Sequence, residues 1–154
     1  MIPLAVPNLT GREAEYLQQC IETTFVSSVG PFVTLFEEKV AEAAGASHAV
    51  ATSAGTTGLH VALEAMGVGR NDLVVLPSFT FIASANAIAY CGASPWLFDI
   101  TEESWTLDPE LLDKHLATET HQEEGRLIHN ATGRRVAAVM PVYTLGMPAD
   151  MDAI

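Results

Sequence analysis

The sequence predicts an α/β fold of three layers, α/β/α, in which helices cover both faces of a mostly parallel, mixed sheet. Two observations support this prediction. From residue 48 onward, predicted strands alternate with predicted helices, a pattern typical of parallel sheets joined by crossover helices. One predicted strand, 73–76, is the continuous apolar run Leu-Val-Val-Leu, which is typical of a strand covered on both faces. At 154 residues, the chain has the length of one domain.

Composition limits the classes of partner. Hydrophobic residues make up 49% of the chain and charged residues 17%, so a large buried core is expected. The formal net charge of −12 argues against a nucleic-acid surface, which would need a basic face. Residues 1–7 have no basic flank and too short an apolar run for a signal peptide, and no later segment approaches the ~20 apolar residues of a membrane span. We therefore expect a cytoplasmic protein that binds neither nucleic acid nor membrane.

Cysteine and histidine residues give no sequence signal for a metal site. The two cysteines, Cys20 and Cys91, are isolated, and we expect both to be buried free thiols. Three histidines share a polar region with two glutamates, but their spacing matches no metal-binding template, so a solvated loop is expected. These residues are His115, His121, His129, Glu123 and Glu124.

Two N-terminal helices are predicted from a cap and from apolar periodicity. Thr10 and Glu13 have the spacing of a capping box, which would open a helix that ends near Thr23. A second helix is predicted from about residue 32 to residue 44. One apolar face of each helix is expected to point inward. The inward positions are Ala14, Leu17 and Ile21 in the first helix, and Phe32, Phe36, Val40 and Ala43 in the second.

A strand, a loop and a helix then follow one another closely. Residues 48–52 are predicted as a short strand. From Leu59 the apolar residues recur with the i, i+3, i+4, i+7 spacing of a helix face, and Gly67 is expected to end that helix in a left-handed conformation. The loop between them is rich in hydroxyl groups, and Gly55 and Gly58 would let the backbone approach a ligand closely.

This loop is a candidate anion site. The first turn of a helix carries N–H groups without internal acceptors and the positive end of the helix dipole, which together favour a phosphate. Thr56 and Thr57 add hydroxyl donors. Alternatively, Ser53 and Thr56 only cap the helix and the glycines only form the turn. The loop lacks the ending of a P-loop and the G-x-G-x-x-G of a dinucleotide fold, which disfavours a nucleoside triphosphate or NAD.

The rest of the chain continues the alternation. Asp108 followed by Pro109 is a typical helix start. We predict a helix of small residues at 82–90, a strand at 95–99, a short helix from 108 to about 116, a polar loop or hairpin at 121–135 and a last strand at 136–140.

The predicted topology brings several loops to one edge of the sheet. Ligands of open α/β sheets bind beyond the carboxyl ends of the strands. The convergence of four loops there favours the phosphate interpretation over simple capping. The loops that leave the sheet at this edge are 53–57, 77–81, 99–101 and 142–146.

Three motifs occur in order: Ala-Gly-Thr-Thr-Gly-Leu-His at 54–60, Pro-Ser-Phe-Thr-Phe-Ile-Ala-Ser-Ala-Asn-Ala at 77–87 and Gly-Met-Pro-Ala-Asp-Met-Asp at 146–152. They resemble the sugar-nucleotide aminotransferases of the DegT family, which are pyridoxal-phosphate enzymes of the aspartate-aminotransferase fold, fold type I. The resemblance extends over nearly the whole chain. It implies that residues 1–154 are the N-terminal portion of an incomplete large, cofactor-binding domain whose C-terminal remainder is absent.

The resemblance also implies an activity. In the full-length protein, an amino acid such as glutamate would donate its amino group to a nucleotide-linked 4-keto-6-deoxy sugar, with pyridoxal 5'-phosphate as cofactor and a homodimer sharing its active sites. Segment 25–30 and the polar insert before Val136 resemble the branch that acts on a UDP-linked N-acetyl sugar for legionaminic-type nonulosonic acids. Two alternatives are a sugar dehydratase of the same family, in which histidine replaces the lysine, and a non-catalytic binding or interaction module.

Site residues are carried over from the family by motif. Gly55 and Thr56, with the Thr56 hydroxyl and the Thr57 amide, would hold the cofactor phosphate. Phe81 would stack on the pyridine ring, although from the residues alone a core aromatic is the favoured interpretation. The implied substrate contacts are Ser28 and Ser84.

No catalytic residue is expected in this chain. The family's aspartate that pairs with the pyridine nitrogen, and its Schiff-base lysine, lie beyond Ile154. The two lysines present, Lys39 and Lys114, sit on polar helix faces and lack the desolvated setting of a nucleophilic lysine. Tyr143 stands where the family often has histidine. We therefore expect a fragment that binds the cofactor without a lysine link and whose exposed apolar surface is buried by the rest of the protein or by an assembly.

Overall fold

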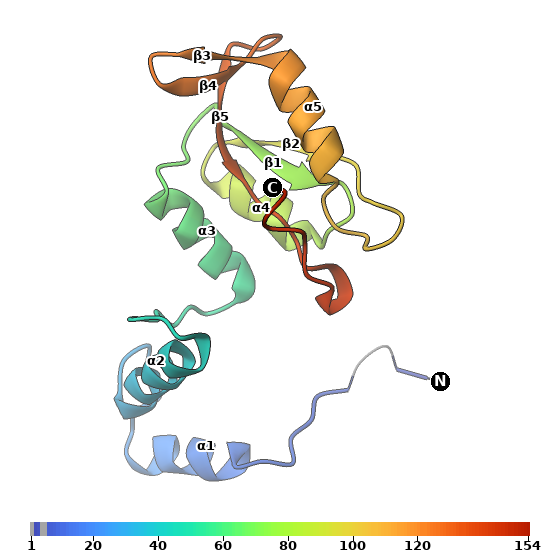
Figure 1. Ribbon diagram of the computed structural model, residues 1–154. Coiled ribbons are helices and arrows are strands. Elements are labelled where there is room, and N and C mark those ends of the chain that lie inside the picture. The colour runs from blue at the N-terminus through green and yellow to red at the C-terminus, as the bar shows by residue number, and fades with distance from the viewer. Residues whose placement is uncertain (1, 4–5) are drawn as a thin grey trace. The chain divides into compact units, whose positions relative to one another are not determined.

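The computed structural model describes residues 2–3 and 6–154 (Figure 1). The segment 1–7, from which we argued against a signal peptide, includes Met1, Leu4 and Ala5, which lie outside the described residues. The chain divides into two compact units, Met1–Ala51 and Thr52–Ile154. Within the described part of the chain, no helix has the length and apolar character needed to cross a membrane.

The first unit contains two helices, α1 (Glu13–Glu22) and α2 (Pro31–Ala44). Pro31 occupies the first helical position of α2, where its missing N–H costs no hydrogen bond. Gly45 ends α2 with a φ of +64°, the left-handed conformation that favours glycine. The predicted second helix is thus confirmed to within one residue at its start.

The predicted capping box at the start of α1 is wrong. Arg12 precedes the helix and makes no side-chain cap. Instead, the N–H and the hydroxyl of Thr10 both donate to Asn8 Oδ1, at 3.2 and 2.8 Å. Such a local side-chain hydrogen bond competes with capping. Because the helix itself begins at Glu13, the two residues of the expected box are not placed as cap and third helical residue.

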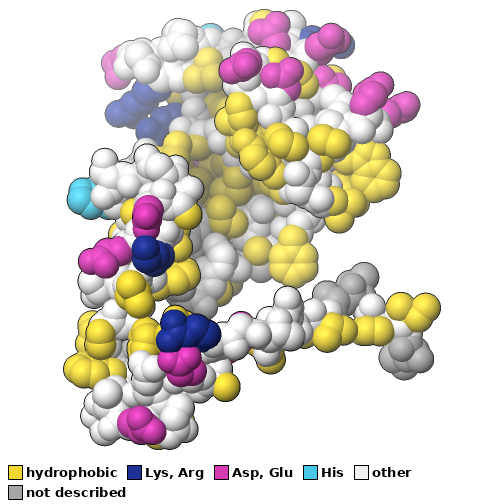
Figure 2. Space-filling view, turned by 60° about the horizontal axis from the view of Figure 1, so that its bottom comes forward, with side chains coloured by type: hydrophobic (Ala, Val, Ile, Leu, Met, Phe, Trp, Pro, Cys, Tyr) yellow, Lys and Arg dark blue, Asp and Glu magenta, His cyan; other side chains and the backbone are white. Residues whose placement is uncertain are grey.

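The expected inward faces of α1 and α2 remain largely exposed within this unit. Leu17, Ile21 and Phe36 each have more than half of their surface in solvent. Apolar side chains of the two helices line a hollow of about 370 Å³. Figure 2 shows hydrophobic side chains at the surface of both units. Periodicity identified the apolar faces correctly, but it does not tell what covers them.

The second unit is built on a five-stranded mixed sheet with the order β2-β1-β5-β4-β3. The central strand β1 is parallel to both β2 and β5, whereas β4 is antiparallel to both β5 and β3. The last two strands in this order form the predicted polar hairpin. The strands are β1 (Leu73–Pro77), β2 (Ser94–Phe98), β3 (Thr120–Glu123), β4 (Arg126–His129) and β5 (Arg134–Val139).

Helices cover the two faces of this sheet. α3 (Gly55–Ala65) and α4 (Ile82–Tyr90) pack on one face, where Val74 and Leu76 meet side chains such as Ile88. α5 (Pro109–Glu119) packs on the other face against Val75. Alternate residues of β1 therefore point into different cores, and all five β1 residues are buried. The predicted three-layer α/β/α architecture is confirmed.

The cap of α5 is also confirmed, and the helix runs three residues beyond its predicted end. Asp108 Oδ1 accepts hydrogen bonds from the N–H groups of Glu110 and Leu111, at 2.9 and 3.1 Å. These two donors have no acceptor inside the helix, so the side chain satisfies them.

The predicted strand at 48–52 is wrong. In the described chain, this segment has no strand pairing, and Val50 is 77% exposed. The Ala51 N–H donates to Glu37 Oε1 at 2.8 Å rather than to a neighbouring strand. A strand requires a partner for its backbone groups, and local side-chain preference cannot supply one.

Candidate cofactor site

The carboxyl ends of three parallel strands meet at one edge of the sheet. Pro77 at the end of β1 is in register with Phe98 at the end of β2, and Val75 is in register with Val139 at the end of β5. The loops that follow these three strands therefore leave the sheet at the same edge, as predicted. The fourth predicted loop, 53–57, does not follow a strand of this sheet, because residues 48–52 form none. Ligands of open α/β sheets bind at this edge.

The loops after β1 and β5 enclose a cavity of about 380 Å³ at this edge. Phe81 lies in its wall, at the N-cap of α4, and is 79% exposed. It is therefore not a core aromatic, and the interpretation favoured from the residues alone is wrong. Tyr143 lines the same cavity and is about half exposed. Two aromatic faces are thus available to a ligand in this cavity.

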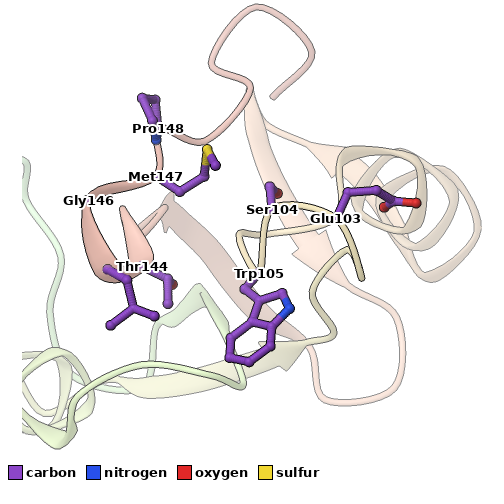
Figure 3. Close-up of a pocket in the computed structure, with 8 residues that line it drawn as sticks. Glu103, Ser104, Trp105, Thr144, Gly146, Met147 and Pro148 are labelled. Carbon is purple, nitrogen blue, oxygen red and sulfur yellow. The ribbon is translucent and has the colours of Figure 1, made fainter.

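A second cavity, of about 420 Å³, lies next to the first, and Thr144 and Leu145 line both (Figure 3). Its other wall is the loop after β2, where Trp105 lies. The Trp105 ring meets Phe79 edge to face, with 5.4 Å between the ring centroids. Thr144 Oγ1 is buried and has no hydrogen-bond partner among the described residues. A buried hydroxyl in this state is available to a ligand or to a further protein group.

Thr144 belongs to one of the loops predicted to converge here, but neither Thr144 nor Trp105 was predicted to have a role. No local motif marks either residue. Their closeness arises from the loops after β2 and β5, which are far apart in the sequence. The positive φ of Trp105, +59°, is a local conformational signal that only the structure reveals.

The first turn of α3 presents backbone donors, as predicted. The helical hydrogen-bond ladder begins with the Gly58 N–H, which donates to the Ala54 carbonyl at 3.0 Å. The N–H groups of Gly55, Thr56 and Thr57 precede this bond and have no acceptor within the helix. They lie at the positive end of the helix dipole, which favours an anion.

The N-cap of α3 is Ala54, and neither Ser53 nor Thr56, which were proposed as caps, occupies this position. The Thr57 hydroxyl donates to the Ala54 carbonyl at 2.8 Å and accepts from the Ala54 N–H at 3.1 Å. Ser53 Oγ lies 3.2 Å from the same hydroxyl. Thr57 therefore uses its hydroxyl to fix the turn and keeps only its N–H for a ligand. Thr56, which is half-buried, is the remaining hydroxyl-bearing residue of the first turn.

The two glycines of the loop have different roles. A Cβ atom at Gly55 would meet no atom within 4 Å, so the backbone there is open to a ligand. A Cβ atom at Gly58 would lie 3.2 Å from Thr52 Oγ1, so this glycine accommodates a neighbouring side chain. Three free N–H groups beside an open glycine fit the phosphate of a cofactor such as pyridoxal phosphate.

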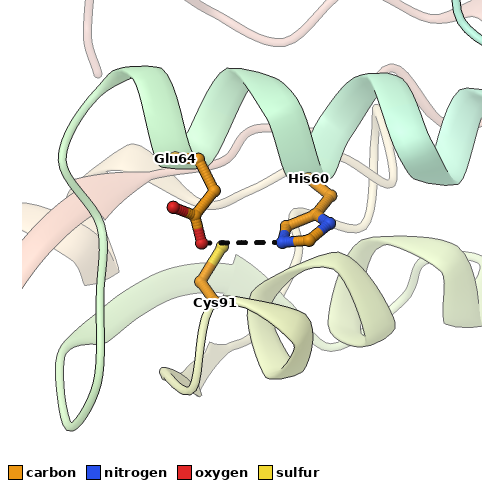
Figure 4. Close-up of side chains that lie close together, drawn as sticks. All are labelled: His60, Glu64 and Cys91. Atoms are coloured by element: carbon orange, nitrogen blue, oxygen red, sulfur yellow. Dashed lines mark ion pairs between the residues drawn. The ribbon is translucent and has the colours of Figure 1, made fainter.

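The first turns of α3 and α4 lie at the same end of the packed helix pair (Figures 1 and 4). The end of α4 meets the middle of α3, where the ring of His60 lies 5.6 Å from that of Tyr90, the last residue of α4. Ser84 in the first turn of α4 is buried, and its hydroxyl lies within hydrogen-bond distance of Thr80 Oγ1, at 3.0 Å. The pair ties the loop after β1 to the helix. Ser28 belongs to the first unit, where it is exposed in the loop before α2.

Neither lysine has the setting of a nucleophile in the described chain. Lys39 is exposed and pairs with Glu42, with 2.7 Å between Nζ and Oε2. Lys114 is exposed on α5. Nucleophilic lysines are activated by desolvation or by a neighbouring cation, and neither condition is met here.

Sequence comparisons find a matching family model and several named relatives. The model of the DegT/DnrJ/EryC1/StrS aminotransferase family matches residues 7–154. GDP-perosamine synthase from Caulobacter vibrioides is 41% identical over 153 residues, covering 99% of this chain and 37% of that protein. GDP-perosamine synthase from Escherichia coli O157:H7 is 36% identical, with coverages of 99% and 38%. The putative pyridoxal phosphate-dependent aminotransferase EpsN from Bacillus subtilis is 35% identical, with coverages of 99% and 37%.

Solved structures with a similar fold are also found. 3-Amino-5-hydroxybenzoic acid synthase superposes with a TM-score of 0.78 and 33% identity, covering 97% of this chain and 35% of the other. DesV from S. venezuelae, solved with a ketimine intermediate, gives a TM-score of 0.72 and 33% identity, with coverages of 92% and 34%. The chain thus spans little more than a third of the length of these relatives. The match over residues 7–154 shows that the chain belongs to the DegT/DnrJ/EryC1/StrS aminotransferase family.

Proposed function

We propose that the protein takes part in the transfer of an amino group to the keto carbon of a nucleotide-linked sugar, with pyridoxal 5'-phosphate as cofactor and an amino acid such as glutamate as donor. One observation carries the proposal: the free N–H groups in the first turn of α3 and the exposed Phe81 at the start of α4 lie at the same end of a packed helix pair. Relatives named as aminotransferases support the cofactor and the reaction class.

In this proposal, the first turn of α3 holds the cofactor phosphate. The N–H groups of Gly55, Thr56 and Thr57 donate to phosphate oxygens, and the Thr56 hydroxyl adds a fourth donor. The Thr57 hydroxyl stays in the turn, where it fixes the Ala54 backbone. Hydrogen bonds to a charged acceptor are stronger than neutral ones, so this turn would supply much of the binding energy of the cofactor.

Phe81 would orient the cofactor by stacking on its ring. Its exposed face requires no rearrangement of the core before a flat ligand binds. The cofactor, when bound, supplies an electron sink for the chemistry at the amino-bearing carbon. The residues of this chain bind and orient, and we assign no proton transfer to Lys39 or Lys114.

We further propose that residues 1–154 correspond to part of a large cofactor-binding domain that acts in a homodimer with shared active sites. That the chain is part of a larger domain is supported by its coverage of the relatives, of which it spans little more than a third. Exposed apolar side chains on both units provide surface that a dimer interface could bury. Ser28 remains a proposed substrate contact. Ser84 is buried, so we propose that it positions the loop after β1 through its hydroxyl pair with Thr80 instead of touching the substrate.

The names of the relatives favour a GDP-linked sugar as the substrate. Two of them are GDP-perosamine synthases, whereas the resemblance of segment 25–30 favoured a UDP-linked 4-keto-6-deoxy-N-acetyl sugar. Because the curated relatives are named as synthases of an amino sugar or as an aminotransferase, amination is also favoured over dehydration.

Two measurements test the proposal. Equilibrium dialysis should show that pyridoxal phosphate binds the protein much more tightly than pyridoxal, which lacks the phosphate. Equal affinities would remove the first turn of α3 from the site. In the complete protein, glutamate-dependent amination should proceed with a GDP-linked 4-keto-6-deoxy sugar and not with its UDP-linked counterpart. The reverse preference would favour the UDP-linked substrate. A product that has lost a further hydroxyl group and gained no amino group would favour the dehydratase.

A further inference from the structure

Three metal-binding side chains of different types converge where the end of α4 meets the second half of α3 (Figure 4). His60 Nε2 lies 3.6 Å from Glu64 Oε1. The Cys91 sulfur lies beside them, and the three donor atoms are all within 4.8 Å of one another. None of the three donors belongs to the first turn of α3, which forms the proposed phosphate site, although His60 lies one helical turn after Thr56. The cluster is defined by its own geometry and does not depend on the proposed function.

Rigid elements position all three donors. His60 and Glu64 are separated by four residues and therefore share one face of α3. Cys91 is the C-cap of α4, directly before Gly92, which has a φ of +75°. A Cβ atom at Gly92 would lie 3.3 Å from the Arg70 backbone, so the turn after Cys91 is closely packed. Donors on packed helices need little reorganisation to bind an ion.

A surface ion pair accounts for only part of this cluster. A histidine and a glutamate four residues apart on a helix form a common and weakly stabilising surface pair. It does not account for a buried thiol beside the same carboxylate. The Cys91 thiol donates to the Ala87 carbonyl at 3.4 Å.

We propose that His60, Glu64 and Cys91 bind a divalent transition-metal ion, with Zn²⁺ as the best match. Nitrogen, oxygen and sulfur ligands are those of zinc sites, and three protein ligands leave the fourth position to water. Tetrahedral zinc with bonds of about 2.0–2.3 Å separates its ligands by about 3.3–3.8 Å, which the histidine–glutamate distance already satisfies.

Charge and access also fit this ion. On binding, the Cys91 S–H bond is replaced by an S–Zn bond and the proton passes to solvent, so a carboxylate and a thiolate balance the charge of the ion. His60 and Glu64 are partly exposed and give the ion a path from solvent. Mg²⁺ and Ca²⁺ prefer oxygen ligands and are disfavoured by the thiol and the imidazole. The ion would fasten the second half of α3 to the end of α4.

The first test uses Co²⁺ as a spectroscopic probe in a Cys20→Ser variant of the protein. In this variant Cys91 is the one remaining cysteine, so a cobalt–thiolate charge-transfer band can arise only from it. We expect the band to appear with one equivalent of Co²⁺ and to disappear when Zn²⁺ is added. Absence of the band in this folded variant would overturn the proposal.

The second test compares Zn²⁺ affinities in competition with a chromophoric chelator. His60→Gln and Glu64→Gln should each weaken binding by roughly tenfold or more, because even outer-shell changes at metal sites cost that much. Both side chains are outside the core, so these variants keep the fold even if Cys91→Ser does not. The matched control pair is His115→Gln and Glu119→Gln, which lie at the same spacing on α5.

We expect the control variants to bind Zn²⁺ as the wild type does. If they lose affinity while the His60 and Glu64 variants keep it, the ion binds elsewhere and the proposal is wrong. Equal affinity in all variants would contradict it as well. A rise of the melting temperature with Zn²⁺ that is absent in Glu64→Gln would support the fastening of the two helices.

Discussion

The guanidinium of Arg135 in β5 binds the carboxylate of Asp72, the residue directly before β1, through two hydrogen bonds: Nε to Oδ1 at 3.0 Å and Nη2 to Oδ2 at 2.5 Å. The same carboxylate accepts the Gly69 N–H at 2.8 Å, and the guanidinium also donates to the Gly67 carbonyl. The Asp72–Arg135 ion pair therefore joins the neighbouring strands β1 and β5 at their amino ends, opposite to the edge with the cavities. It therefore stabilises the sheet without taking part in the proposed site.

Replacing Asp72 should destabilise the protein measurably. Asp72→Asn leaves the partly buried guanidinium donors of Arg135 without a charged acceptor, and a hydrogen bond to a charged group contributes about 1.5–3 kcal/mol. Urea unfolding at neutral pH measures the loss. The control is Glu42→Gln, whose partner Lys39 is exposed and from which little change is expected. An Asp72→Asn protein as stable as the wild type would show that the pair contributes nothing.

The same pair predicts an acid dependence of stability. Hydrogen bonding from Arg135 lowers the pKa of Asp72 below its ordinary value of 3.8, helped by the Gly69 N–H and opposed by burial. Because the pKa is lower in the folded state, the contribution is complete above 3.8 and is lost as the pH falls through the folded pKa. The difference in unfolding free energy between wild type and Asp72→Asn should therefore shrink on acidification. A difference independent of pH would contradict the assignment.

Much of the fold was predictable because several elements have local signals. The continuous apolar run of β1 and the cap at Asp108 each depend on neighbouring residues, and both were predicted correctly. The strand at 48–52 was predicted wrongly because a strand exists only with a partner, which local sequence does not specify. The helix face that includes Phe36 was recognised, but its exposure depends on what packs against it.

The candidate site was less predictable. The donors of α3 follow from its position after a glycine-rich loop, which is a local feature. The exposure of Phe81 and the orphaned hydroxyl of Thr144 depend on how distant loops meet. For the same reason, nothing in the sequence brings Cys91 to His60, since only the packing of α4 on α3 does so.

Thr56 should contribute to cofactor binding. Its hydroxyl and N–H would form hydrogen bonds to a charged phosphate, each worth about 1.5–3 kcal/mol, so loss of the hydroxyl in Thr56→Ala should weaken binding of pyridoxal phosphate by roughly tenfold or more. A fluorescence titration measures the affinity. The N–H remains in the variant, and the loss should therefore be partial.

The matched control for this variant is Thr118→Ala. Thr118 is exposed on α5, where its hydroxyl donates to the Lys114 carbonyl at 2.8 Å within the helix. Its replacement should leave cofactor affinity unchanged. Equal affinity in the Thr56 and Thr118 variants would exclude the Thr56 hydroxyl from the phosphate site, while a loss for pyridoxal as large as for pyridoxal phosphate would assign Thr56 to another part of the cofactor.

Phe81 offers the sharpest separation of ligand binding from folding. Because its side chain is 79% exposed, Phe81→Ala should change the unfolding free energy by no more than about 0.5 kcal/mol. Loss of an aromatic stacking partner, worth about 0.5–1.5 kcal/mol, should weaken binding of the cofactor severalfold. The matched control is Phe98→Ala: Phe98 is 4% exposed in the core beside α5, and its loss should cost about 3–5 kcal/mol. Melting curves and cofactor titrations on both variants decide the role of Phe81, since a large loss of stability with unchanged affinity would make it a structural residue after all.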